Sequence, residues 1–141
     1  MKLAVFSHCV IDSIKIGDAS YEQVGGPACY CSWTARNLKG VKYVLFTNKR
    51  EISMLDKDRI YSLTLPNREI YDTTGIGDIF SSTFCSTFLK EKDSIWAFCF
   101  ASGAAQAAIE SKKVGLEKVP KKGATETNAT YFYNAISRFE F

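Results

Sequence analysis

The chain has 141 residues, of which 46% are hydrophobic and 23% charged, and its formal net charge is +3. This composition is typical of one folded domain and excludes an intrinsically disordered polymer. Basic residues are interspersed with acidic and apolar ones, and the longest apolar stretch (95–109) is shorter than a membrane span, so neither nucleic acid nor a membrane is an expected partner. Five cysteines without a Cys-x-x-Cys pair, and one histidine, favour free thiols in a reducing cytoplasm over a zinc site.

The N-terminal part predicts a strand, a hairpin and a helix. The apolar run Leu3–Phe6 indicates a buried strand, and Asp12 follows its carboxyl end, where open α/β sheets place ligand-contacting groups. Residues 14–24 alternate apolar and polar side chains around a Gly-Asp turn, which predicts an exposed hairpin. Residues 25–40 begin with Gly-Gly-Pro and end in glycine, which favours a helix.

Two further strands and a helix are predicted next. Residues 41–47 form a second apolar run, typical of a buried strand. Residues 52–65 predict two short strands joined at Asp-Lys-Asp, 56–58. From Asp78 the spacing of apolar residues becomes helical, because phenylalanines recur every four residues.

The C-terminal part predicts a second helix and a less regular end. Asp93 or Ser94 can cap a helix that runs to about residue 111. Residues 112–129 are polar and predict a loop, and 130–141 predict a last short helix. The order of strands and helices predicts an α/β fold.

The stretch "DTTGIGD", residues 72–78, places two glycines directly before the first of these helices. Glycine tolerates backbone angles that turn successive N–H groups toward one point, and the start of a helix adds its own unpaired N–H groups there. Such a concavity binds an anion, and phosphate is the usual one. Asp78 either caps the helix or acts as a general base beside a transferred phosphoryl group, and the residues alone leave both open.

Three stretches resemble parts of the ribokinase-like (pfkB) carbohydrate kinase family. "DTTGIGDIF" is similar to the family's signature D-T-T-G-A-G-D-x-F, from which only Ile76 departs. "SHCVIDSI" with "GGPACYCSWTARNLKG" resembles its amino-terminal strand, substrate aspartate and Gly-Gly loop, and "FASGAAQAAIESKKVG" resembles its adenine-side helix. The resemblance implies a ribokinase-like α/β fold, with a partial sheet flanked by helices and a small lid hairpin.

The resemblance also implies an activity: ATP-dependent, Mg²⁺-assisted phosphorylation of a hydroxyl on a small sugar, polyol or nucleoside. It makes Asp78 the base that deprotonates the acceptor. The N–H groups of four residues would form the anion hole: Gly75, Ile76, Gly77 and Asp78. Acceptor contacts would come from Asp12, Gly25 and Gly26, and nucleotide contacts from Thr74, Ala101, Gly103 and Ala104. The hairpin at 14–24 would be the lid, and this lid or an exposed sheet edge would allow a homo-oligomer.

Some positions depart from the family pattern. Tyr30 or a neighbour stands where many members have a sugar-contacting asparagine, which leaves polyols and nucleosides open as acceptors. The family's T-x-G-x-x-G segment would fall at 47–52, where both glycines are replaced. "NKRE" also matches the family's N-x-x-E motif near Mg²⁺, which makes Asn48 and Glu51 candidate metal-organising residues.

The chain is short for a complete ribokinase-like sheet, which needs roughly twice this length. We therefore expect one truncated domain, with a substrate and lid segment at 1–40, a nucleotide and catalytic segment at 41–120 and a tail at 121–141. The alternative to a kinase is a catalytically inactive remnant that binds a phosphate, a nucleotide or a partner chain.

Overall fold

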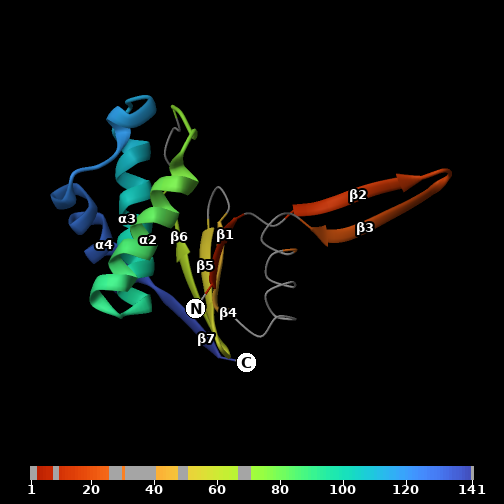
Figure 1. The fold of residues 1–141 in the computed structure, drawn as a ribbon, viewed down its shortest axis with the longest axis horizontal. Coiled ribbons are helices and arrows are strands. Elements are labelled where there is room, and N and C mark those ends of the chain that lie inside the picture. The colour runs from red at the N-terminus through yellow and green to blue at the C-terminus, as the bar shows by residue number, and fades with distance from the viewer. Residues whose placement is uncertain are drawn as a thin grey trace. The chain divides into compact units, whose positions relative to one another are not determined.

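The computed structural model describes residues 3–7, 10–25, 30, 41–47, 51–66 and 71–140. The chain forms two compact units, one made of Met1–Ser62 and Arg138–Phe141 and the other of Leu63–Ser137. Strands and helices occur in the order of a mixed α/β fold, which confirms the predicted fold class (Figure 1). Most of the helix predicted at 25–40 lies outside the described residues.

The described part of the main sheet has five strands in the order β1-β4-β5-β6-β7. Their bounds are Leu3–Ser7 (β1), Val41–Thr47 (β4), Glu51–Asp56 (β5), Arg59–Thr64 (β6) and Ser137–Glu140 (β7). β1 pairs with β4 in parallel, and β4 pairs with β5 in antiparallel orientation. The strand predicted at 41–47 and the strand pair predicted at 52–65 are thus confirmed.

Burial along β5 and β6 follows the two-residue period of a strand. Ile52 and Met54 on β5, and Tyr61 and Leu63 on β6, are buried, while their neighbours along each strand are more accessible. The two strands are joined at Lys57 and Asp58, and Lys57 adopts a left-handed conformation with φ 58°. The Asp-Lys-Asp turn expected from sequence is therefore present.

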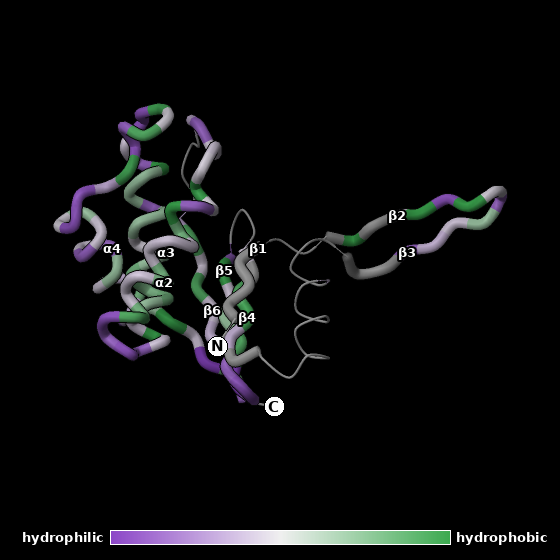
Figure 2. The backbone as a smooth tube through the Cα atoms, in the orientation of Figure 1, coloured by the Kyte–Doolittle hydropathy of each residue, from purple (hydrophilic) through white to green (hydrophobic). Residues whose placement is uncertain are grey.

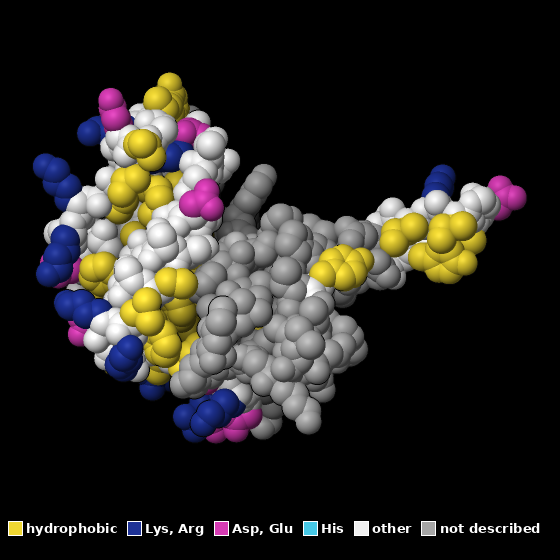
Figure 3. Space-filling view, viewed as in Figure 1, with side chains coloured by type: hydrophobic (Ala, Val, Ile, Leu, Met, Phe, Trp, Pro, Cys, Tyr) yellow, Lys and Arg dark blue, Asp and Glu magenta, His cyan; other side chains and the backbone are white. Residues whose placement is uncertain are grey.

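A separate two-stranded sheet contains the predicted hairpin. β2 spans Val10–Ile16 and β3 spans Ala19–Gly25, and the two strands pair in antiparallel orientation with Ile14 opposite Tyr21. The connection is the predicted Gly-Asp turn, where Gly17 has φ 61°. Hydrophobic and polar positions alternate at the end of β2, from Ile14 to Ile16 (Figure 2), and both isoleucines are exposed, as the hydrophobic side chains on this hairpin in Figure 3 show.

The second unit contains three helices among the described residues. They are α2 (Ile76–Glu91), α3 (Ser94–Glu110) and α4 (Lys122–Ala135), with a short 3-10 helix, η1 (Gly115–Lys118), between α3 and α4. α3 contacts both α2 and α4, and the three helices lie side by side (Figure 1). α3 is capped by Asp93, whose carboxylate accepts hydrogen bonds from the N–H groups of Ile95 and Trp96 at 2.9 Å each.

The predictions for the C-terminal residues were correct only for the helical segment 130–135. The loop expected at 112–129 contains η1 and the first two turns of α4, and the short helix expected at 130–141 ends at Ala135 and is followed by β7. α4 is rich in threonine and asparagine, which are weak helix formers, so local propensity did not indicate it. Packing supplies the missing stability, because Ala129 and Phe132 of α4 are buried.

Candidate active site

The glycine turn predicted to bind an anion ends where α2 begins. Gly75 is the N-cap of α2 and has a left-handed conformation, with φ 73° and ψ 2°. The N–H of Ile76 donates to the carbonyl oxygen of Thr73 at 3.2 Å, which closes the turn. The N–H of Ile79 donates to the carbonyl oxygen of Gly75 at 2.9 Å, which is the first helical bond. The residue at position 75 has a left-handed backbone conformation, which glycine adopts without a steric penalty.

Three of the four predicted anion-hole N–H groups have no backbone acceptor among the described residues. Gly77 and Asp78 precede the first helical donor, so their N–H groups lack intrahelical partners, and the N–H of Gly75 has no acceptor in the turn. The fourth group, on Ile76, is used within the turn. The positive end of the helix dipole adds to the three remaining donors. This arrangement can bind an anion such as phosphate.

Asp78 is the third residue of α2 and is exposed. The N-cap of this helix is Gly75, and no side chain accepts a capping hydrogen bond there. Within the part of the chain that the structure describes, the Asp78 carboxylate has no hydrogen bond or ion pair. Asp78 is therefore not the N-cap of α2, and its exposed carboxylate can be reached by another molecule.

Asp72, at the other end of the same motif, has very different surroundings. The Nζ of Lys118 lies 2.6 Å from its Oδ2 and 3.4 Å from its backbone oxygen, and its Oδ1 accepts the N–H of Thr74 at 2.9 Å. The hydrogen bond from Lys118, and then that from Thr74, lower the pKa of Asp72 from 3.8 to about 2. Asp72 is therefore ionised and fully engaged at neutral pH.

Sequence reasoning missed Lys118. The side chain of this lysine is only 2% exposed, and it reaches Asp72 across 46 residues of chain. Nothing in the sequence distinguishes it from the neighbouring lysines, because its role depends on a contact made by folding. The only hint is its place just before Val-Pro, where the chain turns into α4.

The predicted nucleotide-binding residues fall into two groups. Thr74 is exposed beside the glycine turn, whereas Ala101, Gly103 and Ala104 are buried on α3. The surface of Gly103 is covered by α4: a Cβ placed there would lie 2.7 Å from the backbone nitrogen of Ala129. The geometry thus gives Gly103 a packing role, and nucleotide contacts of these four residues remain predictions.

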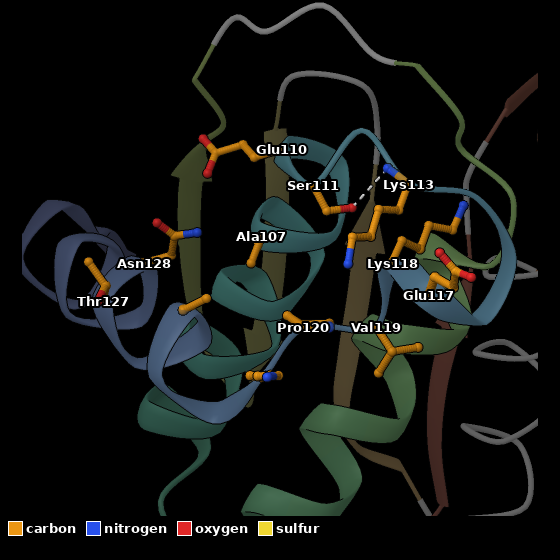
Figure 4. A pocket seen from close by; sticks show the side chains of 12 residues that line it. Ala107, Glu110, Ser111, Lys113, Glu117, Lys118, Val119, Pro120, Thr127 and Asn128 are labelled. Carbon is orange, nitrogen blue, oxygen red and sulfur yellow. Dashed lines mark hydrogen bonds between the residues drawn. The ribbon is translucent and has the colours of Figure 1, made fainter.

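The described residues of the second unit line more than one pocket. A pocket of about 480 Å³ is bordered by Asp78 and Ser82 of α2, by Ala104 of α3 and by residues at the start of α4. A second, of about 580 Å³, is lined by the end of α3, by η1 and by the start of α4, and Lys118 is one of its lining residues (Figure 4). The first of these brings Asp78 and Ala104 to the same cavity.

The predicted acceptor-binding residues belong to the hairpin. Asp12 lies within β2 opposite Gln23, and Gly25 is the last residue of β3. Asp12 is thus inside a hairpin strand and does not follow the end of the first sheet strand directly. Gly26 and Asn48 lie outside the described residues, and Glu51 is exposed at the start of β5.

Neither a metal-binding cluster nor a membrane-spanning helix occurs among the residues that the structure describes. No three His, Cys, Asp or Glu side chains come together there in a way that could hold a metal ion. No described helix combines the length and the apolar character needed to cross a bilayer.

Several solved structures share the fold of this chain. The chain matches a structure described as a possible 1-phosphofructokinase from Thermotoga maritima, with a TM-score of 0.57 and 14% identity, over 79% of this chain and 34% of that one. It matches a ribokinase from Thermotoga maritima with a TM-score of 0.57 and 21% identity, over 67% of this chain and 32% of the ribokinase. A myo-inositol kinase matches with a TM-score of 0.50 and 19% identity, over 72% and 36% of the two chains.

The chain therefore spans about a third of the length of these solved structures. No protein with a curated function matches it. The sequence profile of the pfkB family carbohydrate kinases matches residues 35–122, which include the glycine turn, Asp78 and Lys118. The chain belongs to the pfkB family of carbohydrate kinases.

Proposed function

We propose that this chain carries the phosphate-binding turn and the general base of an ATP-dependent kinase that phosphorylates a hydroxyl of a small sugar, polyol or nucleoside. The observation that carries the proposal is the turn itself. A left-handed Gly75 precedes α2, the N–H groups of Gly77 and Asp78 have no helical acceptor, and the Asp78 carboxylate is exposed without a partner among the described residues. An anion site and a base thus come from adjacent residues.

The reaction needs both features. The Asp78 carboxylate takes the proton of the acceptor hydroxyl as that oxygen attacks the γ-phosphorus of ATP. A new oxygen–phosphorus bond forms, the bond from the γ-phosphorus to the β–γ bridging oxygen breaks, and ADP leaves. The N–H groups of Gly75, Gly77 and Asp78 stabilise the negative charge on the transferred phosphoryl oxygens.

The surroundings of the two motif aspartates support Asp78, and not Asp72, as the base. Asp72 is bound by Lys118 and by the N–H of Thr74, and its pKa of about 2 makes it a poor proton acceptor. Asp78 has no competing hydrogen bond in the described part of the chain, so an acceptor hydroxyl can approach it.

ATP and Mg²⁺ fit this site to different degrees. The unpaired N–H groups of the turn suit a phosphate group of the nucleotide. The described residues do not assemble a metal cluster, and Mg²⁺ commonly binds through substrate phosphates with one or two carboxylates. Bound in that way, Mg²⁺ would neutralise phosphate charge. Asn48 and Glu51 remain the residues proposed near it.

The hairpin is proposed as the lid over the acceptor, with Asp12, Gly25 and Gly26 as acceptor contacts. Its apolar side chains also make it the proposed surface for a homo-oligomer. Ile14 and Tyr21 are paired across the two strands, Ile16 lies on the same face, and Ile16 and Tyr21 are 68% and 55% exposed. Closure over an acceptor, or pairing with a second copy, would cover this face.

ADP release tests the proposal. Purified chain is mixed with ATP, Mg²⁺ and pooled sugars, polyols and nucleosides, beside the Asp78→Asn variant. Release that requires an acceptor and is lost in Asp78→Asn supports the kinase and the base. Equal release from both proteins contradicts the base. No release from the wild type contradicts turnover by this chain, and binding of phosphate without turnover would then support the alternative, a phosphate- or nucleotide-binding module.

A further inference from the structure

Lys118 is a buried cation for which the proposed reaction has no use. Its side chain is 2% exposed, whereas Lys90 and Lys122, which also form ion pairs among the described residues of the second unit, are 76% and 77% exposed. Moving an ammonium out of water is costly unless the charge is paired and hydrogen-bonded. The pairing partner is Asp72, the first residue of the glycine motif. The buried lysine is therefore paired with a residue of the proposed anion site.

Several hydrogen bonds link Lys118, through residues that lie close together in the chain, to the first turn of α2. Lys118 Nζ donates to the carboxylate of Asp72, at 2.6 Å, and to its backbone oxygen, at 3.4 Å. The same carboxylate accepts the N–H of Thr74 through its other oxygen, at 2.9 Å. The next bond closes the turn, from the N–H of Ile76 to Thr73. The ammonium therefore holds Asp72, the residue directly before this turn.

Charge gives Lys118 a second effect on the site. The motif has a carboxylate at each end, Asp72 and Asp78, and the glycine turn between them is the proposed anion site. Each would repel an anion bound there, because charges of the same sign repel one another. Lys118 neutralises Asp72, which leaves Asp78 as the single uncompensated carboxylate of the motif.

We propose that Lys118 is a positioning residue of the anion site: it fixes the glycine turn through Asp72 and cancels the negative charge of Asp72, so that the turn can bind phosphate. The inference rests on the proposed function, because it concerns the same anion site. It does not make Lys118 a catalytic residue, since its ammonium is bound to Asp72 and is nearly inaccessible to solvent.

Inorganic phosphate titrated into ¹⁵N-labelled chain tests this inference, with the amide signals of Gly75, Gly77 and Asp78 as reporters. In the wild type these signals shift with phosphate. In Lys118→Met the apparent phosphate affinity falls by about ten-fold, because Asp72 then repels the ligand and the turn loses its anchor. Lys113→Met is the matched control: Lys113 is an exposed lysine that lines the same pocket as Lys118, so its removal leaves the affinity unchanged.

The double variant Asp72→Asn with Lys118→Met separates charge from folding. It has no unpaired buried charge, and we expect it to fold and to bind phosphate more tightly than Lys118→Met alone. Amide signals of α3 and α4, such as those of Ala104 and Ala129, report whether each variant keeps its fold.

The outcomes are distinct. Wild-type affinity in a folded Lys118→Met, or a double variant that binds no better than Lys118→Met, overturns the role of Lys118 and leaves the proposed function standing. Absence of any phosphate-dependent shift in the wild type overturns the anion site itself, and with it both proposals.

Discussion

Asp72 and Asp78 belong to the same glycine motif, but only Asp72 is engaged. Its carboxylate lies 2.6 Å from the ammonium of Lys118, whereas the carboxylate of Asp78 is exposed and has no partner in the described part of the chain. The motif thus contains one acidic residue that is held in an ion pair and one whose carboxylate is exposed. The predictions for Asp78 and for Asp72 below follow from this difference.

Asp78→Asn is expected to lower turnover by about 10²- to 10⁴-fold, because it removes the proposed general base. ATP binding should stay the same or tighten, since the change also removes a charge that repels phosphate. Turnover is measured as acceptor-dependent ADP release, and ATP affinity by titration calorimetry.

Asp93→Ala provides a contrasting control, because Asp93 is the true N-cap of a helix, α3. It should lower the free energy of unfolding by about 1 kcal/mol and leave turnover of the folded protein unchanged. Asp78→Asn should show the opposite pattern, with little loss of stability. A clear loss of stability in Asp78→Asn with unchanged turnover would return Asp78 to a structural role.

Stability is expected to fall in acid because of Asp72. The folded state lowers the pKa of Asp72 from 3.8 to about 2, so ionised Asp72 stabilises the fold at pH values above about 4. This contribution is lost as the pH falls from about 4 toward about 2, where the carboxyl takes up a proton in the folded state as well. The carboxyl ¹³C signal of Asp72 reports its titration directly.

Lys118→Met should move the midpoint of that titration upward, because the largest cause of the lowered pKa is the hydrogen bond from Lys118. The N–H of Thr74 remains as a smaller cause, so the midpoint should stay below its ordinary value. An Asp72 midpoint that is the same in both proteins would show that the ion pair does not form in solution.

The two motif glycines should respond differently to alanine. Gly75 has φ 73°, a conformation that costs an alanine about 1–2 kcal/mol, whereas Gly77 lies within α2 and has open space where a Cβ would be added. Gly75→Ala should therefore lower both stability and phosphate affinity, while Gly77→Ala keeps the fold. Equal stability of the two variants, measured by urea unfolding, would contradict the left-handed turn.

Features set by a few adjacent residues were predictable from the sequence. The turn at Lys57 follows from its flanking aspartates, the cap at Asp93 from its place before an apolar helix, and the glycine turn before α2 from two glycines ahead of Asp78. In each case the chemistry acts within one turn of chain, so the order of residues is enough to indicate it.

Features that depend on distant contacts could not be predicted in this way. The Lys118–Asp72 pair joins residues 46 positions apart, and although Asp72 belongs to the glycine stretch, no local pattern marks Lys118 as its partner. α4 was expected to be mostly loop because its threonines and asparagine favour other conformations, but burial of Phe132 offsets that preference. Gly103 was expected to contact the nucleotide, and the structure places α4 against it.

Gly103→Ala tests that packing. A Cβ at this position would lie 2.7 Å from the backbone nitrogen of Ala129 and 2.7 Å from the backbone oxygen of Thr125, so α3 and α4 would have to separate. Backbone atoms cannot move aside as a flexible side chain can, and we expect the free energy of unfolding to fall by about 1–3 kcal/mol. Chemical unfolding followed by circular dichroism measures this loss.

Gly123→Ala is the matched control, because Gly123 lies in the first turn of α4 with nothing within 4 Å of an added Cβ. It should raise the free energy of unfolding by about 0.4–1 kcal/mol, since alanine loses less backbone entropy on folding. The two substitutions therefore have opposite signs although the chemical change is the same. If Gly103→Ala proved as stable as Gly123→Ala, α4 would not be packed on α3 in solution, and Gly103 would again be open to a nucleotide.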